Sequence, residues 1–121
     1  LFACRIKSKD VKATYAFLKA KGADLLSEPQ QLPNGQVHFL LRDPNGNLFD
    51  IVEGGGWFMD TKFEGKTGGV AGAMIGVSNI EKAMTLYSDI LGYSTIEYDF
   101  TEVSLACQGI PGGENTVRRV L

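Results

Sequence analysis

The residues best suited to chemistry lie on two neighbouring strands that the sequence predicts to form a hairpin. His38 is the one histidine of the 121-residue chain, and Asp50 interrupts an otherwise apolar strand. A buried carboxylate without a partner is costly, so Asp50 needs either a counter-charge or a bound ligand. Imidazole and carboxylate groups together suit a divalent metal ion. Alternatively, a salt bridge to Arg5 or Arg42 satisfies Asp50, and His38 is an ordinary hydrogen-bonded strand residue.

The turn between the two strands determines which side chains share a face of the sheet. Residues 43–46, of sequence DPNG, have Asp first, Pro second and Gly last, where a left-handed backbone is required. Pairing the strands outward from this turn sets Leu40 opposite Asp50 and makes His38 and Asp50 diagonal neighbours. The side chains of His38 and Asp50 are then expected to lie within reach of each other or of one ion.

Alternation along the hairpin strands divides their side chains between two faces. Apolar side chains suited to packing beneath a helix lie on one face: Phe39, Leu41, Phe49 and Ile51. The other face, called the cleft face below, carries His38, Leu40, Arg42, Leu48, Asp50 and Val52. The predicted metal ligands are Asp50 and His38. The predicted ligand-binding residues are Leu40, Arg42, Leu48 and Val52, together with Arg5, Gly72 and Met74 from other strands.

Residues 1–53 supply the elements that position these groups. In order, the sequence predicts a strand at 2–6, a helix at 11–21, an edge strand at 23–28 and hairpin strands at 36–42 and 47–53. Ser8 or Asp10 can cap the first turn of the helix, and Gly22 ends it.

A second set of elements follows a glycine-rich linker at residues 54–68. It comprises a strand at 70–77, a helix at 79–91 and strands at 93–100, 102–107 and 116–121. Ser78 and Glu81 are placed as a capping box, and Gly92 ends the helix. The same order of strand, capped helix and glycine thus occurs twice, which indicates a duplicated module. Two unrelated α+β segments with similar patterns would give the same order.

Three stretches resemble one superfamily. Residues 42–53 look like the closing hairpin of a vicinal-oxygen-chelate module, usually written DPxGNxxEL. Residues 10–23 are similar to the first helix of that module, and residues 76–93 to the start of the next. This superfamily includes glyoxalases, bleomycin-resistance proteins and extradiol dioxygenases. The resemblance implies an α+β fold of tandem βαβββ modules at 1–53 and 69–121, the second incomplete.

The resemblance also implies a cleft that holds one divalent metal ion in the active members. The carboxylate of the last strand corresponds to Asp50, which is one methylene shorter than the usual Glu. The first-strand ligand corresponds to Leu1 in the first module and to Gly72 in the second, and neither can bind a metal. His38 is a substitute suggested by the hairpin geometry.

Two classes of function follow from these residues. One is a metal-dependent lyase, isomerase or dioxygenase that acts on a small molecule in the cleft. The alternative is a metal-free binding protein that sequesters an antibiotic-type small molecule, and a structural remnant with an inactive cleft is a third option. Open sheet edges of an incomplete module favour a homodimer. Trp57, Phe58 and Phe63 are candidates to close one end of the pocket.

Composition excludes several other classes. The net charge is −2 and the densest basic cluster is the pair Arg118–Arg119, which argues against a nucleic-acid partner. No apolar run approaches a membrane span, and there is no targeting signal or dinucleotide fingerprint, so neither a membrane nor a nucleotide cofactor is expected. Cys4 and Cys107 are expected to be buried free thiols in a cytoplasmic protein. Both chain ends fall within predicted strands, which suggests a fragment of a longer protein.

Overall fold

The computed structural model describes residues 2–55, 65–101, 105–114 and 118–120. Its elements are β1 (Phe2–Ser8), α1 (Val11–Ala20), β2 (Asp24–Leu25), β3 (Gln30–Gln31), β4 (Val37–Arg42), β5 (Leu48–Glu53), β6 (Gly68–Ile75), α2 (Ile80–Met84), the π-helix η1 (Thr85–Ile90), β7 (Tyr98–Phe100), the 3-10 helix η2 (Leu105–Cys107) and β8 (Arg118–Val120). The predicted α+β class, with a βαβββ module and a partial second module, is confirmed.

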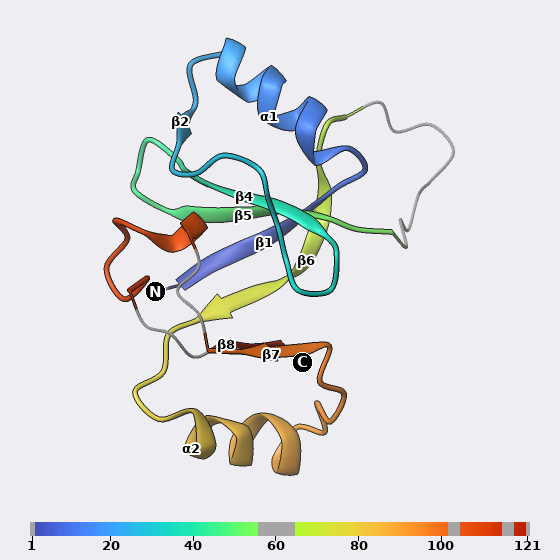
Figure 1. Ribbon diagram of the computed structural model, residues 1–121, viewed down its shortest axis with the longest axis vertical. Coiled ribbons are helices and arrows are strands. Elements are labelled where there is room, and N and C mark those ends of the chain that lie inside the picture. Colours follow the sequence, from blue (N-terminus) through green and yellow to red (C-terminus); the bar gives the residue numbers. More distant parts are fainter. Residues whose placement is uncertain (1, 56–64, 102–104, 115–117, 121) are drawn as a thin grey trace.

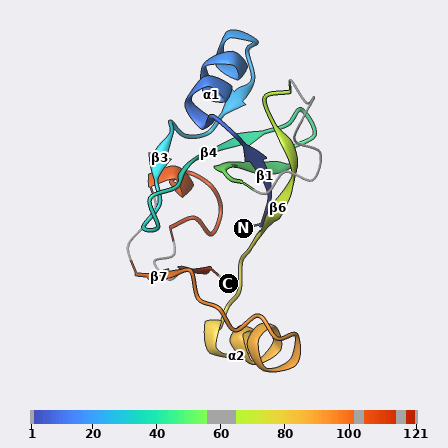
Figure 2. The same ribbon diagram turned by 90° about the vertical axis from the view of Figure 1, so that its right-hand side faces the viewer.

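The main sheet joins both halves of the chain. Its strands follow the order β2-β4-β5-β1-β6, and β3 pairs beside β2 on the edge of β4. β1 lies parallel to β5 and antiparallel to β6, so the first strand of the second half extends the sheet of the first half. Figure 1 shows α1 on one side of this sheet, with α2 and the β7–β8 ribbon on the other. Figure 2 places the two helices at opposite ends of the molecule.

Helix α1 packs on the face that the sequence predicts to be apolar. Asp10 is its N-cap and accepts a hydrogen bond from Ala13 N (2.9 Å), while Gly22 adopts the left-handed conformation after its last turn. Val11 is buried against Phe39 and Ile51, and the rings of Tyr15 and Phe39 meet edge to face at 5.2 Å. This packing confirms the assignment of Phe39 and Ile51 to the helix side.

Ser8, the other candidate cap, has a different role. It is fully buried, and its hydroxyl bonds the Thr14 hydroxyl at 2.9 Å. Both hydroxyls also donate to the carbonyl of Lys66, at 3.2 and 3.0 Å. Ser8 and Thr14 therefore fasten the chain that enters β6 to the start of α1.

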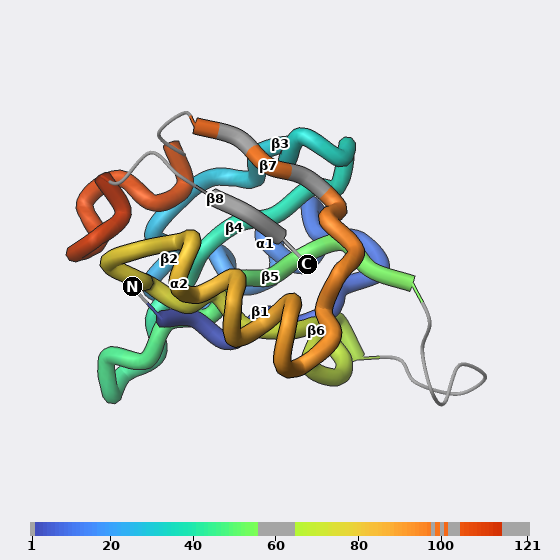
Figure 3. The backbone as a smooth tube through the Cα atoms, turned by 90° about the horizontal axis from the view of Figure 1, so that it is seen from below, coloured from blue at the N-terminus to red at the C-terminus, as the bar shows by residue number. Residues whose placement is uncertain are grey.

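The second helix begins one residue later than predicted. Asn79, not Ser78, is the N-cap, and its side chain accepts from Lys82 N at 2.9 Å. The predicted capping box is wrong because this cap moves Glu81 out of the third helical position. The helix then widens into η1, and neither α2 nor η1 contains a buried residue. Figure 3 shows α2 and the β7–β8 ribbon lying across the main sheet, on the side away from α1.

Two predicted strands of the second half are also corrected. Of residues 93–100, only 98–100 form a strand, because Tyr93 N bonds Tyr87 O and Ser94 N bonds Gly92 O, which keeps the chain in a turn after η1. Within 102–107, residues 105–107 form the 3-10 helix η2, since hydrogen bonds such as Gln108 N to Leu105 O close successive turns. β8 falls within the predicted strand 116–121 and pairs with β7.

Candidate functional site

The hairpin register is the one that the DPNG turn predicts. Leu40 pairs with Asp50, and His38 pairs with Val52. The Asp43 carboxylate accepts hydrogen bonds from the backbone N–H groups of Asn45 and Asn47 and from the Asn47 side chain, at 2.8–2.9 Å. The bond from the Asn47 side chain is the main reason that the pKa of Asp43 lies below its ordinary value. The turn therefore aligns β4 and β5 so that His38 and Asp50 share the cleft face.

Pairing of β1 with two strands brings further residues to this face. Arg5 lies between Asp50 on β5 and Gly72 on β6. Leu40, Asp50, Arg5 and Gly72 thus form one row across four strands. Ala3 pairs with Met74 in a neighbouring row of the same face. These pairings place Arg5, Gly72 and Met74 beside the hairpin, as the sequence predicts for the ligand-binding residues.

Asp50 is the centre of a buried polar cluster. Its Oδ2 accepts from Arg5 Nε at 2.8 Å, and its Oδ1 lies 2.7 Å from His38 Nδ1. The Asp50 side chain is fully buried, and the side chains of His38 and Arg5 are 3% and 13% exposed. Because an ionised carboxylate only accepts, Nδ1 carries the proton of this contact, and a neutral ring then has its lone pair on Nε2. The cluster is an ion pair braced by an imidazole.

One donor of this cluster has no partner. Arg5 Nη2 is buried and forms no hydrogen bond with any described group. On a planar guanidinium, Nη2 and Nε form the edge that normally grips both oxygens of a carboxylate. Here His38 holds Asp50 Oδ1, so Asp50 takes only the Nε proton of Arg5. A charged N–H is left facing the interior of the cleft face unsatisfied, which is costly unless a ligand or water receives it.

Arg42 does not join the cluster. Its Nε bonds Asp24 Oδ2 at 2.8 Å on the exposed β2 edge. Asp24 is directly opposite Arg42 in the β2–β4 pair, whereas Arg5 is directly opposite Asp50. Of the two salt bridges open to Asp50, the structure therefore forms the one with Arg5.

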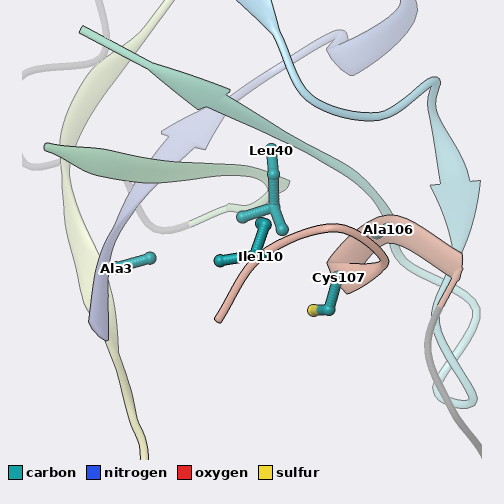
Figure 4. Packing of buried hydrophobic residues seen from close by; sticks show 5 residues of the cluster. All are labelled: Ala3, Leu40, Ala106, Cys107 and Ile110. Carbon is teal, nitrogen blue, oxygen red and sulfur yellow. The ribbon is translucent and has the colours of Figure 1, made fainter. Parts of the chain in front are cut away.

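The apolar part of the cleft face is covered by the chain itself. Ala106, Cys107 and Ile110 pack on Ala3 and Leu40. Figure 4 shows the Ile110 side chain lying between Ala3 and Leu40. Leu26, Leu48 and Met74 border the same cluster. Residues 105–110, called the cover below, thus lie over the predicted ligand-binding residues beside the polar cluster.

The sequence did not identify the cover. The apolar residues Ala106 and Ile110 lie four positions apart, a helical spacing that a strand prediction hides. Cys107 is buried and Cys4 partly buried, and both are free thiols, as predicted. The predicted pocket residues Trp57, Phe58 and Phe63, together with Leu1, lie outside the described residues.

The donors present do not by themselves fit a divalent metal ion. Both oxygens of Asp50 already bind Arg5 and His38, and the guanidinium stands 2.8 Å from the carboxylate. Gly72 contributes no donor atom. Among the described residues, no three His, Cys, Asp or Glu side chains are grouped to hold an ion. Nor does that part of the chain contain a helix with the length and apolar character needed to cross a membrane.

Comparison with known proteins identifies the first module. Residues 3–51 match the family model described as Glyoxalase/Bleomycin resistance protein/Dioxygenase superfamily. This segment contains the whole Arg5, His38 and Asp50 cluster. No curated protein and no solved structure gave a match to the chain.

Proposed function

Because residues 3–51 belong to the Glyoxalase/Bleomycin resistance protein/Dioxygenase superfamily, we propose that this chain binds a small molecule on the cleft face without a resident metal ion. The polar cluster of Arg5, His38 and Asp50 orients the ligand, and the apolar residues Leu40 and Met74 contact its body. The role is capture of a small molecule rather than its conversion. A cleft with few, precisely placed polar groups on apolar walls is typical of small-molecule sites.

The occupied carboxylate of Asp50 carries this proposal. A cation that approaches Asp50 meets the positive charge of Arg5, which already lies 2.8 Å from the same group. A polar or anionic ligand instead meets Arg5 Nη2, a buried donor without a partner. The electrostatics of the cluster therefore favour a ligand that accepts hydrogen bonds over one that donates positive charge.

A metal-dependent lyase, isomerase or dioxygenase is the second candidate. The observation that favours it is the 2.7 Å contact between His38 and Asp50, the two predicted metal ligands. An ion held there requires Arg5 to withdraw from Asp50 and further ligands from another segment or another subunit. The superfamily's usual use of divalent ions supports this candidate, and the donor set of the described residues weighs against it.

Metal content separates the two candidates. Protein purified without chelator or affinity tag is analysed for divalent ions, and its thermal unfolding is followed with added nickel, zinc, manganese and ferrous iron. The binding proposal expects no equimolar ion and no stabilisation by any of the four. An equimolar ion that is lost in Asp50→Asn and retained in Asp24→Asn would favour the metal-dependent candidate. Asp24 is the matched control because it forms the exposed ion pair of the same hairpin.

Binding itself is tested by NMR titration with small apolar compounds. The proposal expects chemical-shift changes at the methyl groups of Leu40 and Met74. Leu86 and Ile90, exposed on η1, serve as internal controls for non-specific association. Shifts confined to those control residues would count against a ligand site on the cleft face.

Two further proposals concern the setting of the protein. A homodimer would cover β6, the terminal strand of the main sheet as described, whose sequence GGVAGAMI carries no charge or proline to block edge pairing. Sedimentation as a monomer at high concentration would contradict this. A reducing cytoplasmic location is supported by the two free cysteines.

A further inference from the structure

We propose that the ligand of the cleft face carries one carboxylate on an apolar body, and that the carboxylate binds Arg5 Nη2. This inference rests on the proposed function and adds the chemical class of the ligand. It comes from three features of the cleft face: an unpartnered charged donor, a surplus of positive charge and an apolar surface held by a displaceable cover.

The geometry of the guanidinium selects a planar oxyanion. Arg5 Nε is already committed to Asp50 Oδ2, while Nη2 on the same edge has no partner. A neutral acceptor would satisfy the hydrogen bond, but a carboxylate would also meet the charge, and charge-assisted bonds are roughly twice as strong as neutral ones. A second carboxylate can thus complete the grip that His38 prevents Asp50 from taking.

The sign of the local charge points the same way. β1 places Arg5 and Lys7 on the cleft face through their pairing with Asp50 and Val52. Asp50 is the one carboxylate among the cleft-face residues named for the hairpin, and it is neutralised by its contact with Arg5. With His38 neutral the face keeps a net positive charge, and protonation of His38 would increase it. One anionic group on the ligand balances this charge.

The side of Arg5 toward β6 has no competing side chain. Its neighbour there is Gly72, and a Cβ atom at that position would lie 3.9 Å from Arg5 Cδ. Any residue larger than glycine would therefore extend over the stem of Arg5. Gly72 leaves room for a ligand group to approach the guanidinium, as the sequence predicts for this residue.

The cover marks the position of the apolar body. Ile110 and Cys107 pack on Leu40 and Ala3, next to the row that contains Asp50 and Arg5. A ligand that reaches Arg5 from this side takes the place of Ile110 on Leu40. Binding therefore opens the cover and exposes Cys107, which is 1% exposed when the cover is closed.

A matched pair of probes tests the ligand class. 4-Phenylbutyrate and its amide, 4-phenylbutyramide, have the same shape and differ in charge. Isothermal titration is expected to show that the acid binds about tenfold tighter or more, since hydrogen bonds to charged groups exceed neutral ones by roughly that factor. The double variant Arg5→Gln/Asp50→Asn, which removes both charges and keeps similar shapes, should abolish the preference.

A second double variant is the control. Arg42→Gln/Asp24→Asn removes the exposed ion pair of the same hairpin and should keep the preference for the acid. Reaction of Cys107 with iodoacetamide in a Cys4→Ser background gives an independent readout. Its rate should rise with added 4-phenylbutyrate in the parent and in the control variant, and should stay constant in Arg5→Gln/Asp50→Asn.

The outcomes separate this inference from the proposed function. Equal affinity for the acid and the amide, with shifts at Leu40 and Met74, would overturn the carboxylate class and leave the binding proposal intact. No binding of either probe and no methyl shift would overturn both. A preference for the acid that survives in Arg5→Gln/Asp50→Asn would remove Arg5 from the site. If that variant fails to fold, the wild-type comparison of acid and amide still decides the ligand class.

Discussion

The two helices of this chain begin and end alike but pack differently. Each starts at an acidic or amide cap, Asp10 or Asn79, and each is followed by a left-handed glycine. Helix α1 buries Val11 and Thr14 and packs on the hairpin, whereas α2 and η1 bury no residue. Local signals therefore fix where a helix starts and stops, and a sheet beneath it decides whether its apolar face is used.

The sheet accounts for the difference. The first half supplies four strands of its own to the side beneath α1, and α1 contacts β2, β4 and β5. The second half contributes β6 to that same sheet, and its described strands β7 and β8 form only a two-stranded ribbon. A two-stranded ribbon is marginally stable in water and offers little surface to a helix. Stability should thus reside in the first half.

The largest expected effect tests this contrast in the cores. Phe39→Ala should lower the free energy of unfolding by about 3–5 kcal/mol, because the ring is fully buried under Tyr15. Ile90→Ala, at a side chain 70% exposed on η1, should change it by less than about 0.5 kcal/mol. Urea unfolding of both variants measures this. Comparable losses would mean that the second helix is packed as firmly as the first.

The next effect concerns the cover, through which the second half reaches the cleft face. Ile110→Ala should cost about 2 kcal/mol, the lower end for such truncations, because its neighbours Ala3 and Ala106 are small. Leu105→Ala, at an exposed position of the same 3-10 helix, is the control and should be nearly neutral. The same unfolding assay applies. A neutral Ile110→Ala would show that the cover adds nothing to the stability of the first half.

A smaller effect is expected at the two helix caps. Asp10→Ala should destabilise the protein by about 1 kcal/mol, because Ala13 N loses its acceptor at the start of a packed helix. Asn79→Ala removes the equivalent bond to Lys82 N but should change only local helicity. Hydrogen exchange at Ala13 and Lys82 distinguishes global from local opening. Equal losses of global stability would erase the difference between the halves.

The smallest effect lies in the turn that aligns β4 and β5. Hydrogen bonds, chiefly from the Asn47 side chain, lower the folded-state pKa of Asp43. The charged carboxylate therefore adds stability above its ordinary pKa, and this contribution is lost as pH falls through the lowered value. The stability difference between wild type and Asp43→Asn should be present near about pH 7 and vanish near about pH 2. A difference independent of pH would contradict this.

The sequence predicts what is local and misses what depends on distant pairing. The DPNG turn and strand alternation are enough to place His38 beside Asp50, since a tight turn fixes register. Whether Arg5 or Arg42 pairs with Asp50 depends on β1 lying next to β5, across a large separation in sequence. The cover was missed for the same reason, because its apolar residues gain meaning only against Leu40.

The errors in the second half have a common cause. Ser78 and Asn79 are both good caps, and pattern alone does not choose between neighbours. Residues 93–97 and 105–107 have strand-like composition, but the described backbone gives them turns and a 3-10 helix instead of strand partners. The module boundary at residue 69, the homodimer and the metal ligands stay predictions.

The double attachment at Ser8 has a consequence for the length of the connecting segment. Gly54 N donates to the Ser8 carbonyl, and the Ser8 hydroxyl donates to the Lys66 carbonyl, at 3.2 Å each. The segment thus departs from and returns to one residue at the end of β1. The entropic cost of closing such a loop grows only with the logarithm of its length. Extra residues, or an entire inserted reporter domain, can therefore be spliced between positions 54 and 66 while β5, β1 and β6 keep their alignment.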